Sequence, residues 1–456
     1  MRKNLNNMEL NLELLTIQNP WWRGGSLKFD PVLLQYGKNK LKSRPPALAQ
    51  LNFKSDGIYF LSGSRGAGKT TALKLMIKKL IEEDGIKPRQ IFYYSCHNLD
   101  SAEQLNEMIK LFLNQANRRQ RAYIFIDEIT MIKDWQSGLN YLRKAGKFKK
   151  AAVIFSGSFL EKAIDGKINI LNMPSLALAE FVGLINPAFY QKIKRNNFSA
   201  WADKIEYYLD IYLLTGGQIG AINSYYDNGA VSQNVYSNSL YWLLANVVRL
   251  GRDPALVRQI MEKIILNLGR SVGYKTLAAK TRARTHLTAA EYLDLLEKMF
   301  VVKTIYQSDG GQPTSRKAKK VYFQDPFFFW LFYAYTHGSL NYWQLARERL
   351  FDRAVFSHLL ENVIFSHLLK DGKNNLTYWR DNVKKQEINF LARQGKKLTP
   401  ILIRYDKEIK DEDFKIFKQA GFKRGIIISK DKLENKGDFK IMPLSYFLMF
   451  YEEVLR

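Results

Sequence analysis

Nine consecutive residues near the start of the chain have the types and spacing of a loop that binds phosphate groups. They are Gly63, Ser64, Arg65, Gly66, Ala67, Gly68, Lys69, Thr70 and Thr71. Glycines allow the backbone to curl so that several N–H groups point at a phosphate, and the N-terminus of a following helix adds its dipole. In this interpretation Lys69 reaches the β- and γ-phosphate oxygens, and the Thr70 hydroxyl binds Mg²⁺.

The segments on either side of the loop support this interpretation. Residues 57–62 are apolar and β-prone, which predicts a buried strand. Residues 71–83 place Leu73, Ile77 and Leu80 at helical spacing. The alternative is a glycine turn that arose by chance, and the strand–loop–helix context argues against it.

A second candidate site, Asp127 and Glu128, ends the apolar run Ile124-Phe-Ile. Ligands of open α/β sheets bind at the carboxyl ends of strands. We expect Asp127 to hold Mg²⁺, mostly through water, and Glu128 to polarise the attacking water. The alternative is a strand that ends in a solvated acidic turn. Downstream of a phosphate-binding loop, the acidic pair instead predicts nucleotide hydrolysis.

Ser158 is a third candidate catalytic residue, at the end of the next predicted strand, residues 151–156. A small polar side chain there would lie near the γ-phosphate and sense it or orient water. A Gly-Ser pair also commonly just ends a strand. The predicted ATPase core has no Asn-Lys-x-Asp sequence for guanine downstream of the loop, so ATP with Mg²⁺ is the expected cofactor.

Residues 55 to about 174 alternate between strand-like and helical patterns. Residues 90–95, 122–127 and 151–156 are the strand-like runs after the first. This alternation predicts an α/β fold with a mainly parallel sheet and helices on both faces. Before it, Asn19-Pro-Trp-Trp22 offers two tryptophans that either stack on a base or, as we favour, cover the edge of this domain.

The region after residue 175 changes character twice. Residues 175–250 are helical in pattern, with a turn at Thr215-Gly-Gly-Gln218, and are interpreted as a lid over the nucleotide. Three helices then follow, at 255–268, from 274, and at 285–298, before strands at 301–306 and 320–323. Three helices and a β-hairpin predict a winged helix.

Basic residues surround the predicted winged helix. Its third helix would be the recognition helix, and its wing would carry Arg316, Lys317, Lys319 and Lys320. Lys280, Arg282 and Arg284 are interpreted as helix residues that form a phosphate-facing edge. Many winged helices pack only against protein, so a DNA partner and a protein partner both stay open.

The composition favours a polyanionic partner and a reducing compartment. The formal net charge is +27, from 70 Lys and Arg against 43 Asp and Glu, and nucleic acid is the commonest cytoplasmic polyanion. A generally basic proteome is the alternative. The single cysteine, Cys96, excludes an intrachain disulfide framework. The most hydrophobic run, residues 327–335, is about half a membrane span, so we expect a cytoplasmic protein without a membrane segment.

Across nearly its full length the chain resembles a family of prokaryotic AAA-type P-loop ATPases. Members join the ATPase core to a winged helix and a C-terminal nuclease-like domain of the restriction-endonuclease fold. The matching segments are Asn19–Trp22, Gly63–Thr71, Asp127–Thr130 with Asp134-Trp135, Gly157-Ser158, Thr215–Gly217 and Tyr322–Phe327. The resemblance implies ATP and Mg²⁺ binding by the residues already assigned.

Three departures from the family pattern bear on activity. Residues 164–174 contain no arginine where the family usually has one, which removes a candidate γ-phosphate cation and puts fast hydrolysis in doubt. Ile219 stands where a proline is usual. In the nuclease-like domain, Glu361 fits the helix position, but Asn389 replaces the strand acid, and Leu402-Ile-Arg404 replaces the Glu-x-Lys. Glu387, on the same strand face as Asn389, is a partial substitute.

These observations divide the chain as follows: 1–54, an N-terminal segment; 55–175, the ATPase core; 176–250, the helical lid; 251–335, the winged helix; and 336–456, a degenerate nuclease-like domain. The leading hypothesis is a Mg²⁺-dependent ATPase that moves a winged helix and an inactive nuclease-like domain, with DNA as the favoured partner. The alternatives are a slowly hydrolysing signalling switch that binds a protein and, least favoured, an ATP-regulated nuclease. Oligomerisation stays open.

Overall fold

The computed structural model divides the chain into two compact units, residues 1–174 and 175–456. It describes residues 15–24, 27–43, 45, 48, 51, 53, 57–99, 101–117, 119–158, 168–309, 312–314, 318–370 and 375–455. The finer division into lid, winged helix and C-terminal domain stays a prediction.

Unit 1 is built on a five-stranded parallel sheet with the order β2-β3-β4-β1-β5. The strands are β1 (Gly57–Ser62), β2 (Ile91–Ser95), β3 (Ala122–Asp127), β4 (Ala151–Gly157) and β5 (Asn169–Asn172). Because β3 and β4 are buried along their whole length, they need apolar residues on both faces. The predicted parallel sheet is confirmed.

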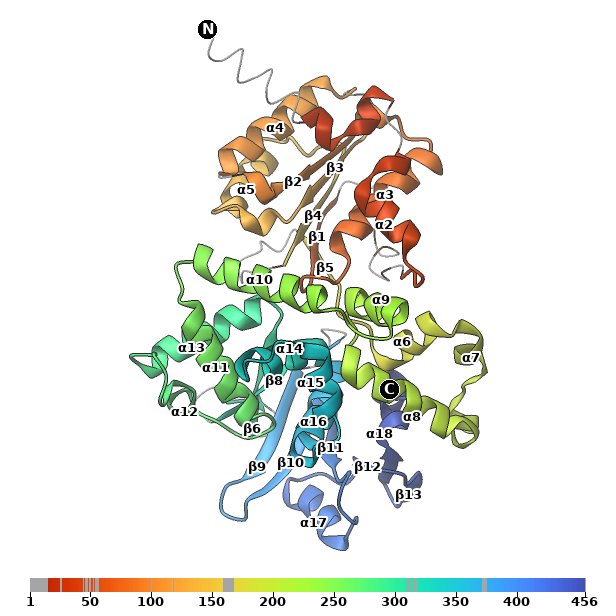
Figure 1. The fold of residues 1–456 in the computed structure, drawn as a ribbon, viewed down its shortest axis with the longest axis vertical. Helices are drawn as coiled ribbons and strands as arrows, with labels where there is room; N and C mark the ends of the chain where they lie inside the picture. The colour runs from red at the N-terminus through yellow and green to blue at the C-terminus, as the bar shows by residue number, and fades with distance from the viewer. Residues whose placement is uncertain are drawn as a thin grey trace. The chain divides into compact units, whose positions relative to one another are not determined.

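Helices cover both faces of this sheet. Figure 1 shows α4 (Ala102–Gln115) and α5 (Trp135–Lys144) on one face and α2 (Pro31–Lys38) with α3 (Lys69–Glu82) on the other. In α3, Leu73, Ile77 and Leu80 are buried together, as their spacing predicts. The crossover from β1 to β2 passes over β4 and β3, so the loop after β1 opens beside the ends of β3 and β4.

Side chains from the first described residues cover the open edge of β2. The Asn19 side-chain amide donates to the Tyr93 carbonyl at 2.9 Å and accepts from the Tyr93 N–H at 2.7 Å. The Trp21 and Trp22 indole N–H groups both donate to the Ile91 carbonyl. The structure therefore confirms that the tryptophans cover an edge, and both are buried.

Unit 2 begins with helices, and its later part combines a mixed sheet with further helices. Its helices are α6 (Leu178–Ile185), α7 (Pro187–Lys192), α8 (Ala202–Thr215), α9 (Ile219–Asn228), α10 (Gln233–Arg249), α11 (Pro254–Leu266), α12 (Tyr274–Ala278), α13 (His286–Lys298), α14 (Pro326–Thr336), α15 (Tyr342–Arg349), α16 (Arg353–Leu369), α17 (Asp411–Gln419) and α18 (Leu444–Leu455). The apolar run 327–335 lies in α14 and is almost entirely buried, as its composition predicts.

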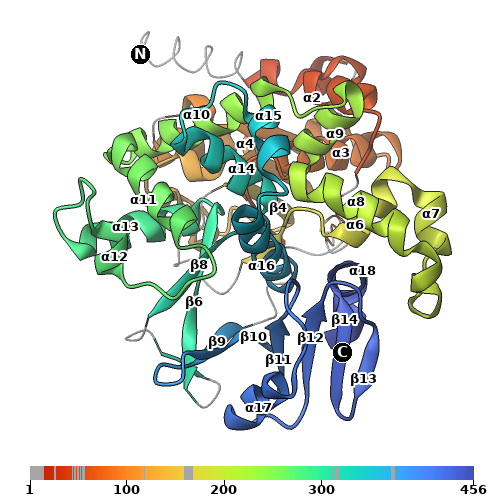
Figure 2. The same ribbon diagram turned by 60° about the horizontal axis from the view of Figure 1, so that its bottom comes forward.

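The sheet of unit 2 has the order β13-β14-β12-β11-β10-β9-β6-β7, and β8 also pairs with β6. Its strands are β6 (Val302–Asp309), β7 (Gln312–Pro313), β8 (Lys319–Phe323), β9 (Asn375–Asp381), β10 (Gln386–Gln394), β11 (Lys397–Ile403), β12 (Gly425–Ser429), β13 (Glu434–Lys436) and β14 (Phe439–Pro443). The antiparallel hairpin β6–β8 joins the later strands because β6 pairs in parallel with β9. Helix α16 packs on β8 and α18 (Figure 2).

The turn between Thr215 and α9 is fixed by a distant carboxylate. Asp325 caps the start of α14 by accepting from the Phe327 N–H at 2.7 Å, and its second oxygen accepts from the Gly217 N–H at 2.9 Å. Gly216 has a φ of +66° and lies so close to Asp325 that an added Cβ would overlap its carboxylate. Two segments that the sequence singled out therefore meet at one buried carboxylate.

Among the described residues, no helix combines the length and the apolar character needed to cross a membrane.

Candidate functional site

The loop Gly63–Thr71 connects β1 directly to α3, as predicted. Gly66 and Gly68 have φ values of +84° and +87°, a left-handed conformation that residues with a Cβ rarely adopt. Gly68 is the N-cap of α3, so the first turn of a 14-residue helix faces the loop. The loop therefore has the curled backbone and the helix N-terminus that an anion-binding site requires.

The Lys69 side chain folds back over the loop. Its ammonium donates to the carbonyls of Gly63 at 3.0 Å and Ser64 at 2.9 Å, and to the Ser158 hydroxyl at 2.6 Å. The Glu128 carboxylate lies 3.7 Å away. Only 4% of Lys69 is exposed, so a buried positive charge stands inside the loop.

Thr70 and Asp127 meet at the carboxyl end of β3. The Thr70 hydroxyl donates to Asp127 Oδ2 at 2.7 Å, and the Tyr93 hydroxyl donates to the same oxygen at 3.1 Å. The Ser156 hydroxyl donates to Asp127 Oδ1. A hydroxyl and a carboxylate side by side are hard oxygen ligands of the kind that Mg²⁺ prefers.

Glu128 follows in a left-handed backbone conformation, with a φ of +51°. Such a conformation is strained for a residue with a side chain, and strain of this kind concentrates at functional sites. Its carboxylate accepts from the Ser158 N–H at 3.2 Å and from the Ser158 hydroxyl at 2.7 Å. Ser158 therefore links Glu128 to Lys69.

Electrostatics keep the Glu128 carboxylate ionised. Burial alone would raise the pKa of Glu128, but Lys69, the Ser158 hydroxyl, His97 and Arg65 together hold it below its ordinary value. Arg65 itself is exposed at the outer side of the loop. An ionised glutamate beside a buried ammonium has the charge state that a water-polarising base requires.

The structure thus brings all the predicted site residues of unit 1 together. The glycine-rich backbone, the α3 N-terminus and Lys69 fit a chain of phosphates, and Thr70 with Asp127 fits a magnesium ion. The roles given to the individual side chains stay predictions. The donor set, however, is the one that a Mg²⁺-nucleotide needs.

Three further residues at this site were missed from the sequence. Ser156 donates to Asp127 and accepts from the Glu128 N–H at 3.0 Å, Tyr93 donates to Asp127, and His97 lies close enough to affect the Glu128 pKa. Ser156 and His97 stand near or just beyond the carboxyl ends of β4 and β2, and Tyr93 lies in the middle of β2. The alignment of parallel strand ends is the signal that would have found Ser156 and His97.

Unit 2 holds a second cluster, formed by Glu361 of α16 and Glu387 of β10. The ammonium of Lys320, on β8, lies between them: it donates to Glu361 Oε1 at 3.0 Å and also to Glu387 Oε1. The Tyr322 hydroxyl donates to Glu361 at 2.5 Å, and Arg380 lies 3.7 Å from Glu387. Asn389 instead uses its side-chain oxygen to accept from the Ile403 N–H at 3.0 Å.

Among the residues that the structure describes, no three or more His, Cys, Asp or Glu side chains gather in a way that could hold a metal ion. In unit 2, the two acids that the sequence singled out bind a lysine. Burial lowers the pKa of Lys320, but the two carboxylates more than compensate and leave it raised. The cluster is therefore a closed ion-pair network.

Two predictions about basic residues are wrong. Lys319 and Lys320 were expected on an exposed wing, but Lys320 is fully buried, and the Lys319 ammonium lies 3.2 Å from the centre of the Tyr274 ring. Arg316 and Lys317 lie outside the described residues. Lys280, Arg282 and Arg284 were expected on a helix, but they lie in the turn between α12 and α13, where Lys280 has a φ of +56°.

The comparisons with known proteins agree with the geometry of unit 1. Residues 55–182 match the model of a family described as an AAA domain. The chain therefore carries an AAA-type P-loop domain. Residues 206–331 and 356–447 match two families described as domains of unknown function, DUF8612 and DUF4143.

A relative and two solved structures show more distant similarity. An uncharacterised protein of Haemophilus influenzae is 22% identical over 285 residues, which cover 59% of this chain and 67% of the relative. The ORC1 protein of Aeropyrum pernix, solved with DNA, is 14% identical with a TM-score of 0.30, over 72% of this chain and 95% of that one.

The second structure is a signal transduction ATPase with numerous domains and a tetratricopeptide repeat sensor, from Pyrococcus horikoshii. It is also 14% identical with a TM-score of 0.30, over 73% of this chain, which spans only 54% of that protein. Scores this low do not establish a shared fold across the whole chain.

Proposed function

We propose that unit 1 binds ATP with Mg²⁺ at the loop Gly63–Thr71 and hydrolyses it. The observation that carries this proposal is the connected set of contacts from Lys69 through Ser158 to Glu128, next to the Thr70–Asp127 pair. Lys69 and the backbone of the loop would hold the phosphates, and Thr70 with Asp127 would hold the metal ion. Bound magnesium would neutralise charge on the phosphate oxygens.

Hydrolysis by this site should be slow unless Glu128 is released. Its carboxylate already accepts two hydrogen bonds from Ser158, and Lys69 lies 3.7 Å away. A γ-phosphate that attracts Lys69 would draw the ammonium away from Glu128 Oε1 and open that side of the carboxylate to water, while Ser158 keeps both of its hydrogen bonds. Nucleotide binding and activation of the base would then be coupled through one lysine.

The decisive experiment is ATP binding by calorimetry to wild type and to Lys69→Ala. Loss of a charge-assisted contact to phosphate should weaken ATP binding on the order of 100-fold. Lys79→Ala removes an exposed lysine of the same helix and should leave binding unchanged. Unchanged ATP affinity in Lys69→Ala would refute the proposal.

Glu128→Gln separates hydrolysis from binding. The amide keeps the size of the side chain but cannot accept a proton from water, so turnover should fall by about 100-fold or more while ATP still binds. If turnover in this variant equals that of wild type, Glu128 is not the base.

We further propose that unit 2 acts on DNA through the turn between α12 and α13. Lys280, Arg282 and Arg284 are exposed there, and the Thr285 hydroxyl caps α13 by accepting from the Thr288 N–H. Exposed basic side chains beside a helix N-terminus suit phosphate contacts. The net charge of +27 would add long-range attraction.

Whether DNA is the partner can be tested by measuring binding to a DNA duplex over a range of salt concentrations. Lys280→Ala and Arg284→Ala should each make the slope of log binding constant against log salt concentration shallower, by about one released counterion. Lys415→Ala, an exposed lysine of α17, is the matched control. Salt-independent binding, or equal slopes in all variants, would instead favour the alternative of a signalling switch with a protein partner.

We also propose that the C-terminal region is an inactive nuclease-like domain. The position of Lys320 between Glu361 and Glu387 supports this proposal. Its ammonium occupies the place between the two carboxylates that a catalytic metal ion would have to take. Purified protein with Mg²⁺ or Mn²⁺ should leave plasmid DNA intact. Cleavage that disappears in a Glu361→Ala, Glu387→Ala variant would contradict the proposal.

A further inference from the structure

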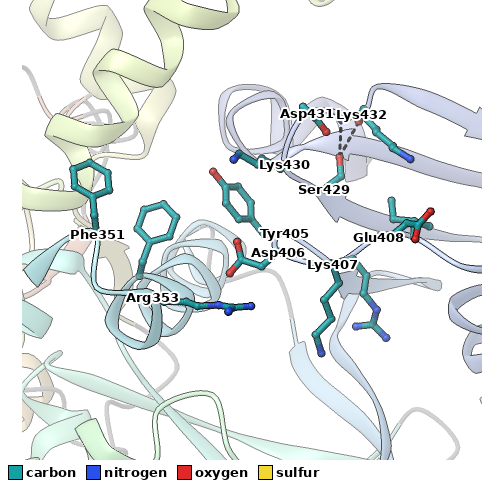
Figure 3. A pocket seen from close by; sticks show the side chains of 13 residues that line it. Phe351, Arg353, Tyr405, Asp406, Lys407, Glu408, Ser429, Lys430, Asp431 and Lys432 are labelled. Carbon is teal, nitrogen blue, oxygen red and sulfur yellow. Dashed lines mark hydrogen bonds between the residues drawn. The ribbon is translucent and has the colours of Figure 1, made fainter.

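A cavity of 580 Å³ opens in unit 2 at the carboxyl ends of β11 and β12 (Figure 3). These strands are parallel neighbours, so the loops that follow them diverge at the same edge of the sheet. The cavity lies between residues 404–409, residues 429–432 and the residues around the start of α16. Its size and its place at strand ends are typical of a ligand site.

Three aromatic rings form one end of the cavity. The ring centroids of Phe351 and Phe356 are 6.0 Å apart, and those of Phe356 and Tyr405 are 5.7 Å apart. Phe351 is 68% exposed, which is unusual for a large apolar side chain beside a cavity. The rings therefore present π-faces and edges to whatever enters.

Four carboxylates lie close enough to the aromatic end to act on Tyr405. The pKa of Tyr405 is raised to about 12 by burial and then by the negative charges of Glu206, Asp406, Asp210 and Asp431. Glu206 and Asp210 lie one turn apart on α8, and burial raises the pKa of each. Across the described residues, these four carboxylates make no ion pair within 4.0 Å.

The cations that line the cavity offset this charge only in part. Arg404 is already paired with Asp413 at 2.5 Å. Figure 3 shows the Lys407 and Lys432 ammonium groups directed away from Tyr405. Arg353 and Lys430 remain near the rings, against Asp406 and Asp431 of the lining. Glu206 and Asp210 of α8 do not line the cavity, but their charges also act on Tyr405. The aromatic end is therefore locally negative in a chain whose net charge is strongly positive.

Aromatic faces combined with carboxylates are the chemistry that holds an ammonium or guanidinium group. We propose that this cavity binds an arginine side chain of a basic peptide segment in a protein partner, with the guanidinium over the Phe351, Phe356 and Tyr405 rings and paired with Asp406 and Asp431. A nucleic acid strand would stack on the same rings but would bring its phosphates to the carboxylates. The local charge therefore favours the basic peptide.

The test is the binding of a fluorescein-labelled tetra-arginine peptide to the full chain, measured by anisotropy. The net charge of +27 repels this probe from the rest of the surface, so binding reports a local site. Phe351→Ala should weaken binding about tenfold, and the Asp406→Asn, Asp431→Asn double variant by at least as much. All three side chains are exposed, so circular dichroism should show an unchanged fold.

Glu434→Gln, an exposed acid on β13, is the matched control and should bind the peptide like wild type. Equal affinity in all variants, or no binding at millimolar peptide, would overturn the proposal. A fifteen-residue thymidine oligonucleotide whose binding is lost in Phe351→Ala would also overturn it, in favour of single-stranded nucleic acid. None of these outcomes depends on ATP binding by unit 1.

Discussion

Each unit holds a buried lysine between acidic side chains, and the two lysines differ in what else surrounds them. Lys69 of unit 1 bonds two carbonyls and a hydroxyl, while its nearest carboxylate oxygen is 3.7 Å away. Lys320 of unit 2 bonds both Glu361 and Glu387 directly. Both lysines are at most 4% exposed.

The difference lies in how completely the charge is paired. Burial lowers the pKa of Lys69, and its acids only partly offset this, whereas the two carboxylates raise the pKa of Lys320 above its ordinary value. A buried cation held mainly by neutral oxygens still gains from an incoming anion. A cation already bound by two carboxylates gains little from a further anion. Burial and nearby acids alone therefore do not distinguish a binding lysine from a structural one.

The largest expected effect concerns Lys320→Ala. Removing the ammonium leaves two carboxylates facing each other, so the free energy of unfolding of unit 2 should fall by about 3–5 kcal/mol. Hydrogen exchange of peptides from β8, α16 and β10 measures this loss within the full chain. Lys303→Ala, which breaks a half-exposed pair with Glu297 on the same hairpin, should cost less than about 1 kcal/mol. If Lys320→Ala and Lys303→Ala lose equal stability, Lys320 is not held by a strong buried ion pair, and its contrast with Lys69 disappears.

Buried His367 makes no ion pair with any residue that the structure describes, and it extends the comparison. His367 accepts from the Leu178 N–H at Nε2 and donates to the Val363 carbonyl from Nδ1, and burial lowers its pKa to about 4. Because the folded pKa lies below the unfolded value of about 6.5, His367 supports stability above pH 6.5. This support should be lost as the pH falls towards 4, by about 3 kcal/mol.

Denaturant unfolding of wild type and His367→Gln between pH 7 and pH 4 measures this effect. The His367→Gln variant should be less stable than wild type at pH 7. It should lose less stability on acidification, because its amide does not titrate. Parallel pH profiles would show that His367 is not the group responsible.

Lys69→Ala should affect stability much less than Lys320→Ala. Glu128 keeps both hydrogen bonds from Ser158 after the substitution, so unit 1 without nucleotide should lose only about 1 kcal/mol. Hydrogen exchange of peptides from β1, α3 and β3 provides the measurement. A loss as large as that of Lys320→Ala would mean that Lys69 is mainly structural.

The smallest expected effect is that of magnesium alone on unit 2. Because Lys320 already neutralises Glu361 and Glu387, excess Mg²⁺ without nucleotide should leave the protection of β10 and α16 against exchange unchanged. Increased protection in wild type would show that the acid pair accepts a metal ion, and the two lysine sites would then resemble each other more closely than their contacts suggest.

The sequence was most informative where function depends on adjacent residues. The loop around Lys69 and the Asp127–Glu128 pair are short patterns at strand ends, so their meeting follows from a parallel sheet. Lys320 could not be placed in this way, because its two partners lie 41 and 67 positions away. A lysine on a predicted wing is expected to be solvated. Only tertiary packing places Lys320 against Glu361 and Glu387.

Similar limits apply to the basic turn and to the cavity. A helix through Lys280 agreed with the local pattern, but the chain turns there before α13 begins. The aromatic end of the cavity combines Phe351, Phe356 and Tyr405 with acids from α8, which no local pattern links. Contacts between elements far apart in sequence account for what the sequence alone did not predict.

The covering of β2 has a consequence for solubility. An edge strand with free backbone groups is a template on which another chain can add a strand and start aggregation. Asn19 and the Trp21 and Trp22 indoles occupy the Tyr93 amide and the Ile91 and Tyr93 carbonyls on that edge. A short segment outside the sheet therefore protects it from self-association by bonding its edge with side chains instead of adding a sixth strand.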